Sequence, residues 1–188
     1  RKTIDGKDWR DVPGIAYRSR ELVKHDPIQQ PNENLDNLDL TNLPTLDNWK
    51  NYLKISQSGY LKDKRPRFWL NIARGCPYDC VHCGGGRNAY RLLTGRENIA
   101  FRSPERVAED IEKLSHLGVQ QISLSHDPEL GTEKYQTQLF DEIKKRNLDI
   151  CIYYESFRVP SRSFLEKMNR ISYETTVAIS PDSPSDEV

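Results

Sequence analysis

The sequence has no excess of charge of either sign, because 28 lysine and arginine residues stand against 28 aspartate and glutamate residues. A chain without net charge lacks the positive field with which proteins bind nucleic acids along their length. It also has no run of about 18 consecutive apolar residues, the length that a membrane-spanning helix needs. Arg1 is followed by no basic-then-apolar leader and is not a methionine. We therefore expect a soluble fragment of a longer protein without a membrane partner; the charge balance argues against a nucleic acid partner but does not exclude one.

Apolar residues are also scarce. They make up 36% of the chain, against about 45–50% in a typical globular domain, and counting glycine in place of tyrosine changes this little. Part of the chain is therefore expected to be extended or loosely packed. The length of 188 residues allows at most one complete domain with an appendage. We divide the chain into a connector or strap, residues 1–66, and a core, residues 67–188.

The strap is expected to be irregular. Residues 26–48 are dense in Asn, Asp, Gln and Pro, which favour turns and local side-chain bonds over regular ladders. Five isolated leucines in this stretch are expected to anchor it: Leu35, Leu38, Leu40, Leu43 and Leu46. Ahead of the strap's polar stretch, residues 12–18 and 21–23 predict a hairpin.

The core alternates strand and helix signals. Short apolar runs predict strands over Phe68–Ala73, Val119–Ser125, Leu148–Tyr154 and Thr175–Ile179. Hydroxyl cap residues open helices over Ser103–Gly118, Thr132–Arg146 and Ser161–Arg170. The connections are too long for hairpins, so the strands are predicted to be parallel, in a doubly wound sheet or an arc of a barrel. We favour an α/β fold: a partial (β/α) TIM-like barrel of about four strand–helix units, with an irregular N-terminal extension and an incomplete C-terminus.

Cysteines are few but unevenly placed. Cys76, Cys80 and Cys83 crowd into one short segment, whereas Cys151 stands alone between two isoleucines in a predicted strand. A secreted disulfide scaffold would be shorter and would spread its cysteines, so we expect a reducing compartment, the cytoplasm. Cys151 is expected to be a small buried apolar residue. The clustered thiols predict a soft metal or redox site.

Three thiolates on one short loop suit either an iron–sulfur cluster or zinc. A structural zinc site needs four protein ligands, so zinc would require Cys151, His82 or His126 as the fourth. A four-iron cluster held by three cysteines leaves one iron open for a cofactor or substrate. We favour the open cluster, and keep zinc and metal-free thiols as the alternatives.

The motif Cys76-Pro-Tyr-Asp-Cys80-Val-His-Cys83, with His82 before the last cysteine and a strand before the first, resembles the radical S-adenosylmethionine (radical SAM) superfamily. The resemblance extends from about Arg67 to Val188. It implies that the three cysteines hold a [4Fe-4S] cluster whose fourth iron binds S-adenosylmethionine. It further implies reductive cleavage of that cofactor to a 5′-deoxyadenosyl radical. A low-potential electron donor such as flavodoxin or ferredoxin and a small-molecule or unknown substrate would be the partners.

The resemblance also implies cofactor contacts at the carboxyl ends of the strands. The family's Gly-Gly-Glu after the second strand is absent, which leaves Asp127, with Glu129 in reserve. Further cofactor-binding candidates are Glu155 and Arg158 after the third strand, Asp182, Ser183 and Ser185 after the fourth, and the backbone of Gly84 and Gly85. Each has a simpler alternative: a surface charge pair, a helix cap and a flexible turn, respectively. No catalytic residue is assigned.

Residues 12–18, followed by the leucine- and proline-containing strap, resemble the connector between a cobalamin-binding domain and a radical SAM barrel. The chain contains no cobalamin-domain motif, so such a domain and its cobalamin would precede Arg1 in a longer parent. Methylation, methylthiolation, rearrangement and ring formation all remain open as reactions. The alternatives to a radical enzyme of unknown substrate are a non-catalytic zinc-binding interaction module and a methylthiotransferase that modifies transfer RNA.

Overall fold

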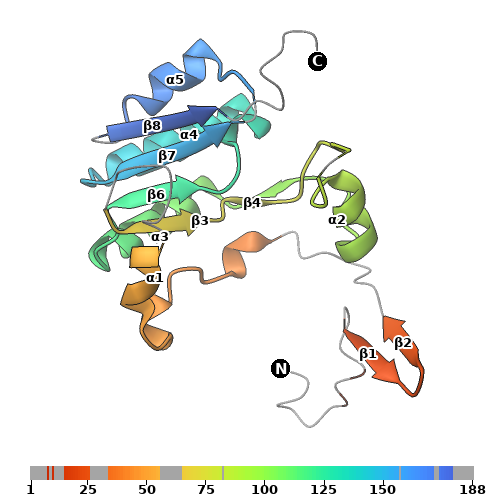
Figure 1. The fold of residues 1–188 in the computed structure, drawn as a ribbon. Coiled ribbons are helices and arrows are strands. Elements are labelled where there is room, and N and C mark those ends of the chain that lie inside the picture. The colour runs from red at the N-terminus through yellow and green to blue at the C-terminus, as the bar shows by residue number, and fades with distance from the viewer. Residues whose placement is uncertain are drawn as a thin grey trace. The chain divides into compact units, whose positions relative to one another are not determined.

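The computed structural model describes residues 8, 10, 15–25, 34–55, 65–81, 83–156, 158–171 and 174–179 (Figure 1). The chain divides into two compact units, and neither is continuous in sequence. One holds residues 1–34 and 74–100, and the other holds residues 35–73 and 101–188. Among the described residues, no helix is both long enough and apolar enough to cross a membrane.

A four-stranded parallel sheet forms the centre of the second unit (Figure 1). Its strands are β3 (Arg67–Leu70), β6 (Gln121–Leu124), β7 (Cys151–Ser156) and β8 (Glu174–Ile179). They lie side by side in chain order, and each neighbouring pair is parallel. A doubly wound sheet reverses its strand order at one point, whereas a barrel adds each strand beside the previous one. The α/β prediction is confirmed, and the sheet is compatible with a partial barrel.

Helices alternate with these strands as predicted. They are α3 (Pro104–His116), α4 (Glu133–Lys145) and α5 (Arg162–Met168). Each begins at a hydroxyl side chain that accepts a hydrogen bond from the backbone N–H three residues later: Ser103, Thr132 and Ser161. These side chains satisfy N–H groups that have no partner inside the helix, which explains why the sequence marked the helix starts so well.

The helices cover one face of the sheet. The pairing register places Ile122 beside Ile152, and Leu124 beside Tyr154, and all four side chains are buried. The Tyr154 ring lies 4.9 Å from that of Phe164 in α5, which packs in turn on the α4 side chain Phe140. This face therefore contains the apolar core of the unit.

The opposite face of the sheet is polar and aromatic. At the N-terminal ends of the strands, the register places Arg67, Gln121 and Cys151 side by side. Arg67 Nε donates to Gln121 Oε1 at 2.6 Å, and Gln121 Nε2 donates to Cys151 Sγ at 3.5 Å. In the next row Trp69 meets Tyr153 edge-on, with ring centroids 6.0 Å apart. A parallel sheet with one apolar and one mixed face is what an arc of a barrel provides, because its inner face lines the centre.

The first predicted strand is wrong in one respect, because it is interrupted. β3 ends at Leu70. After two intervening residues, β4 (Ala73–Arg74) begins and pairs with β5 (Ala100–Phe101) instead of with a strand of the parallel sheet. The third strand also ends later than predicted, so Glu155 lies within β7 and not in the loop after it. Both differences depend on which partner strand is available, which a run of apolar residues does not reveal.

The N-terminal part contains more structure than predicted. The hairpin is confirmed as β1 (Ala16–Ser19) and β2 (Leu22–His25), which pair antiparallel around Arg20 at a φ of 56°. The strap includes two short 3-10 turns, η2 (Leu35–Asn37) and η3 (Leu43–Thr45), and an unpredicted helix, α1 (Trp49–Ile55). Of the five leucines expected as anchors, only Leu35 is buried, whereas Leu38 and Leu46 are exposed. Residues 26–33 of the strap lie outside the described residues.

A buried ion pair connects three segments of the second unit. Arg102, with 1% of its side chain exposed, donates to the wholly buried Asp110 of α3 at 2.6 Å. The same guanidinium donates to the carbonyl of Asn71, after β3, and to that of Leu38 in the strap, at 3.3 and 3.4 Å. Arg106 adds a second, longer pair with Asp110, at 3.6 Å.

Replacing Asp110 with asparagine is expected to destabilise the fold. The substitution leaves the Arg102 guanidinium buried without its counter-charge, which costs about 3–5 kcal/mol of unfolding free energy. The matched control is Arg162→Gln, because Arg162 forms an exposed pair with Glu166 four residues later. Such pairs contribute about 0.3–0.5 kcal/mol. Urea denaturation measures both, and equal losses would show that the buried pair has no special role.

Candidate metal centre and cofactor site

The cysteine motif lies on a tight loop of the first unit, between β4 and α2 (Arg87–Thr94). Cys80 and Cys83 are exposed, Cys76 is half-buried, and all three thiols are free. The Cys83 N–H donates to the carbonyl of Cys80 at 3.1 Å, and the Gly85 N–H donates to the Cys83 sulfur at 3.4 Å. The loop therefore turns within the motif and leaves its thiols accessible.

Asp79, inside the motif, fastens the loop to the start of α2. Its Oδ1 accepts from the Asn88 N–H at 3.1 Å, and its Oδ2 lies 3.9 Å from the Arg87 guanidinium. The carbonyl of Tyr78 accepts from the Arg87 N–H at 2.8 Å. The N-cap residue Gly86 has no side chain that could accept a hydrogen bond from the first backbone N–H groups of α2. Asp79, seven residues before it, supplies this acceptor instead.

Two glycines allow the backbone to approach closely around the loop. A side chain on Gly86 would place its Cβ 3.1 Å from the Tyr78 oxygen and 3.2 Å from Asp79 Oδ1. Gly75, directly before Cys76, has a φ of +104°, and a Cβ there would lie 2.8 Å from the carbonyl oxygen of Asn98. The loop is thus held at its end by α2 and at its start by the segment after α2.

The donor set fits an iron–sulfur cluster better than zinc. Within the described part of the chain, no three His, Cys, Asp or Glu side chains gather closely enough to hold a metal as they stand. Of the three candidates for a fourth zinc ligand, Cys151 is buried and accepts from Gln121, while His126 Nδ1 is 2.9 Å from Ser125 Oγ. The third, His82, lies outside the described residues. Three accessible thiols on one loop suit a cluster that leaves one iron open.

At the carboxyl edge of the parallel sheet, in the second unit, Asp127 contacts two of the other predicted residues, Glu129 and Arg158. Its Oδ1 accepts from the Tyr154 hydroxyl at 2.6 Å and from the Glu129 N–H at 2.7 Å. Its Oδ2 lies 3.5 Å from Arg158 Nε. Burial, and to a smaller extent the hydrogen bond to Asp127, raises the pKa of the Tyr154 hydroxyl. This phenol therefore remains a hydrogen-bond donor well above neutral pH. Asp127 is itself buried, and both its oxygens have partners within the chain.

The other predicted residues differ in accessibility. Glu129 follows Asp127 in η4 (Pro128–Leu130) and accepts from the Ser161 N–H, at 3.3 and 3.4 Å to its two oxygens. Glu155 is half-buried in β7. Gly84 and Gly85 are exposed in the turn after Cys83. The predicted cofactor-binding residues Asp182, Ser183 and Ser185 lie outside the described residues.

Sequence reasoning missed the residues that position the site. Asp79 and Gly75 shape the cysteine loop, and Tyr154 holds Asp127, yet none of them was a candidate. A signal existed for Asp79, because a helix that follows three glycines needs a capping side chain from elsewhere. No comparable signal existed for Tyr154, whose partner depends on the pairing of β6 with β7.

Comparison with known proteins adds the family to this geometry. The model of the radical SAM superfamily matches residues 70–188, which include the cysteine loop and the strands β6, β7 and β8 of the parallel sheet. The chain belongs to the radical SAM superfamily. Over 170 residues this radical SAM chain is 25% identical to a protein of Pyrococcus horikoshii named as an uncharacterized methyltransferase. The match covers 90% of the chain but 33% of that relative, so the chain spans about a third of the relative's length. No solved structure matches.

The thiols of this radical SAM chain are expected to differ sharply in reactivity. Cys76, Cys80 and Cys83 should react with iodoacetamide in the reduced, metal-free protein, whereas Cys151 should be protected. Burial raises the pKa of the Cys151 thiol, so its reactive thiolate forms only at a higher pH than an exposed thiol needs. Peptide mass spectrometry after native and denatured labelling at several pH values measures this. Equal labelling of Cys151 and Cys80 near neutral pH would contradict it.

Removing the Asp79 carboxylate is expected to loosen the loop. Asp79→Ala leaves the start of α2 without its cap, which costs about 1 kcal/mol, while Asp79→Asn keeps an acceptor oxygen and should lose less. Asp141→Ala, at an exposed position of α4, is the control. Hydrogen exchange of the Arg87 and Asn88 amides reports the loop directly. Unchanged protection in Asp79→Ala would show that the contact does not hold the helix.

Proposed function

We propose that the chain is the core of a radical SAM enzyme whose Cys76, Cys80 and Cys83 hold a [4Fe-4S] cluster. The observation that carries this is the set of three free, accessible thiols on one fastened loop in a chain of this superfamily. When bound, such a cluster keeps one iron open for S-adenosylmethionine and supplies the electron that splits it into methionine and a 5′-deoxyadenosyl radical. The residues of the chain bind and orient these groups.

Four cofactor contacts are proposed in the second unit. Asp127, Glu129 and Arg158 follow the ends of two neighbouring parallel strands, and Glu155 lies in the last part of the second strand, β7. This is the edge where α/β folds place their active sites, and Arg158 already lies against Asp127. Glu129 is the more accessible of the first two carboxylates, because Asp127 already has partners within the chain. The remaining proposed contacts are Asp182, Ser183, Ser185 and the backbone of Gly84 and Gly85.

For the longer protein we infer methyl transfer, with cobalamin as a further cofactor. The methyltransferase name of the Pyrococcus horikoshii relative and the connector-like residues 1–66 ahead of a core at 67–188 support this inference. A low-potential donor such as flavodoxin or ferredoxin would deliver the electron, and a small molecule would be the substrate. Accessible unpaired thiols favour a reducing compartment, so we propose a cytoplasmic location.

Anaerobic reconstitution with iron and sulfide tests the cluster. We expect about four irons per chain and a broad visible absorbance, as a four-iron cluster requires. Cys80→Ala should lose both because it removes a ligand, whereas the control Cys151→Ala should keep both because Cys151 is buried in β7. Stoichiometric zinc with no iron uptake would contradict the proposal and favour a zinc-binding interaction module.

The same reconstituted chain then tests cofactor cleavage. With S-adenosylmethionine and dithionite it should form 5′-deoxyadenosine, detected by chromatography, and Cys80→Ala should form none. An intact cluster with no 5′-deoxyadenosine would reject cleavage by this chain while leaving the cluster assignment in place. Methylthiolation of transfer RNA by the full-length protein would replace methyl transfer as its reaction.

A further inference from the structure

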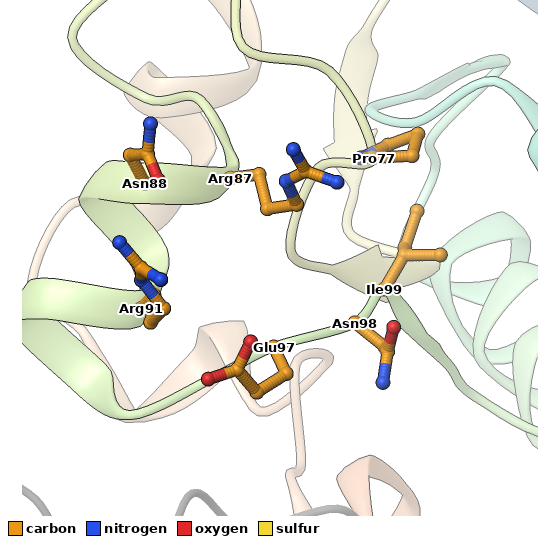
Figure 2. Close-up of a pocket in the computed structure, with 7 residues that line it drawn as sticks. All are labelled: Pro77, Arg87, Asn88, Arg91, Glu97, Asn98 and Ile99. Carbon is orange, nitrogen blue, oxygen red and sulfur yellow. The ribbon is translucent and has the colours of Figure 1, made fainter.

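The first unit contains a pocket of about 350 Å³ beside the cysteine loop (Figure 2). Two arginines and an asparagine of α2 form one wall, Glu97, Asn98 and Ile99 form the facing segment, and Pro77 closes one end. Its volume is in the range of small-molecule sites. None of the cysteines lines it, although Pro77 follows Cys76 directly.

The lining of the pocket holds more positive than negative side chains. Arg87 and Arg91 are one helical turn apart, so both side chains project from the same face of α2. Arg87 has a single long ion pair, at 3.9 Å from Asp79, and its side chain is 56% exposed. Within the described part of the chain no carboxylate pairs with Arg91. Among the described residues that line the pocket, Glu97 is the acidic one, so two arginines stand against one carboxylate; Asp79, which pairs with Arg87, is not part of the lining.

The orientation of α2 supports a binding role for this wall. Its polar residues Arg87, Asn88 and Arg91 line the pocket, while Leu92 and Leu93 are 69% and 63% exposed. Arg87, Asn88 and Arg91 are themselves exposed, so a ligand can reach them from solvent. The contacts with Asp79 and Tyr78 fix the helix at its start and so hold the arginines toward the pocket.

The facing wall is also fixed. The backbone of Asn98 and Ile99 lies so close to Gly75 that a Cβ there would come within 2.8 and 3.0 Å of it. Figure 2 shows Arg87 reaching from α2 toward Pro77, with Glu97 and Ile99 across from the helix. Both walls of the pocket, α2 and the segment of Asn98 and Ile99, therefore contact the cysteine loop.

We propose that this pocket binds a small organic anion through a phosphate or carboxylate group held by Arg87 and Arg91. Guanidinium groups recognise both oxyanions through paired hydrogen bonds. The asparagine side chains add neutral hydrogen-bonding groups, and Pro77 and Ile99 offer a short apolar surface for the remainder of the ligand. Glu97 opposes the anion and so favours a ligand that also carries a hydrogen-bond donor near its charged group.

Calorimetric titration of the metal-free full chain with inorganic pyrophosphate, and separately with citrate, tests the site at constant ionic strength. We expect saturable binding of one anion per chain. Arg91→Gln should weaken it about tenfold, because a charge-assisted bond is lost. Glu97→Gln should strengthen it about threefold, because the opposing charge is removed. Circular dichroism confirms that each variant is folded.

Two control variants separate this site from general charge and from the cluster. Arg170→Gln removes the same charge at an exposed position that does not line the pocket, and it should leave affinity unchanged. Cys80→Ala should also bind as the parent does, so failure of the cluster proposal would leave this result intact. Absent or unsaturable binding of both anions, or an equal loss in Arg170→Gln and Arg91→Gln, would overturn the proposal. So would Arg91-dependent binding of an acidic flavodoxin without anion binding, because the occupant would then be a protein.

Discussion

The buried pair of Arg102 and Asp110 is the interaction on which the second unit depends. One guanidinium with 1% exposure bonds to α3, to the loop after β3 and to the strap. Desolvating an arginine is costly unless its partners are in place, so these three segments can pack only together. This explains why the polar, turn-rich part of the strap from Leu35 onward belongs to the unit of the sheet, although only Leu35 of its five expected anchor leucines is buried.

The cysteine loop is shaped by a different constraint, the close approach of backbone to backbone. Gly75 and Gly86 stand where a Cβ would meet carbonyl oxygens at 2.8 and 3.1 Å. Asp79 then joins the loop to α2, and that helix presents Arg87 and Arg91 to the neighbouring pocket. The same few contacts therefore position both the thiols proposed for the cluster and the arginines proposed for an anion, although the two proposals use different side chains.

The fold was predictable where the determining interaction is local. Ser103, Thr132 and Ser161 cap their helices three residues on, and apolar runs with fixed spacing mark the parallel strands. Prediction failed where a partner is distant. The break in the first strand after Leu70 depends on the pairing of β4 with β5. The helix α2 was not predicted, because its capping side chain, Asp79, lies in the preceding cysteine loop and its leucines are exposed.

For the site, the sequence by itself determined the residue types: three cysteines at one spacing predict a soft metal centre, and a lone cysteine between isoleucines predicts a buried thiol, which the structure confirms. Thiol chemistry depends on residue type and local spacing, which a sequence states directly. The tertiary structure alone decided which polar groups are available. It assigns Tyr154, Arg158 and the Glu129 amide to Asp127 and leaves Arg91 without a carboxylate partner among the described residues. Availability depends on strand pairing and helix placement, which bring together residues far apart in the chain.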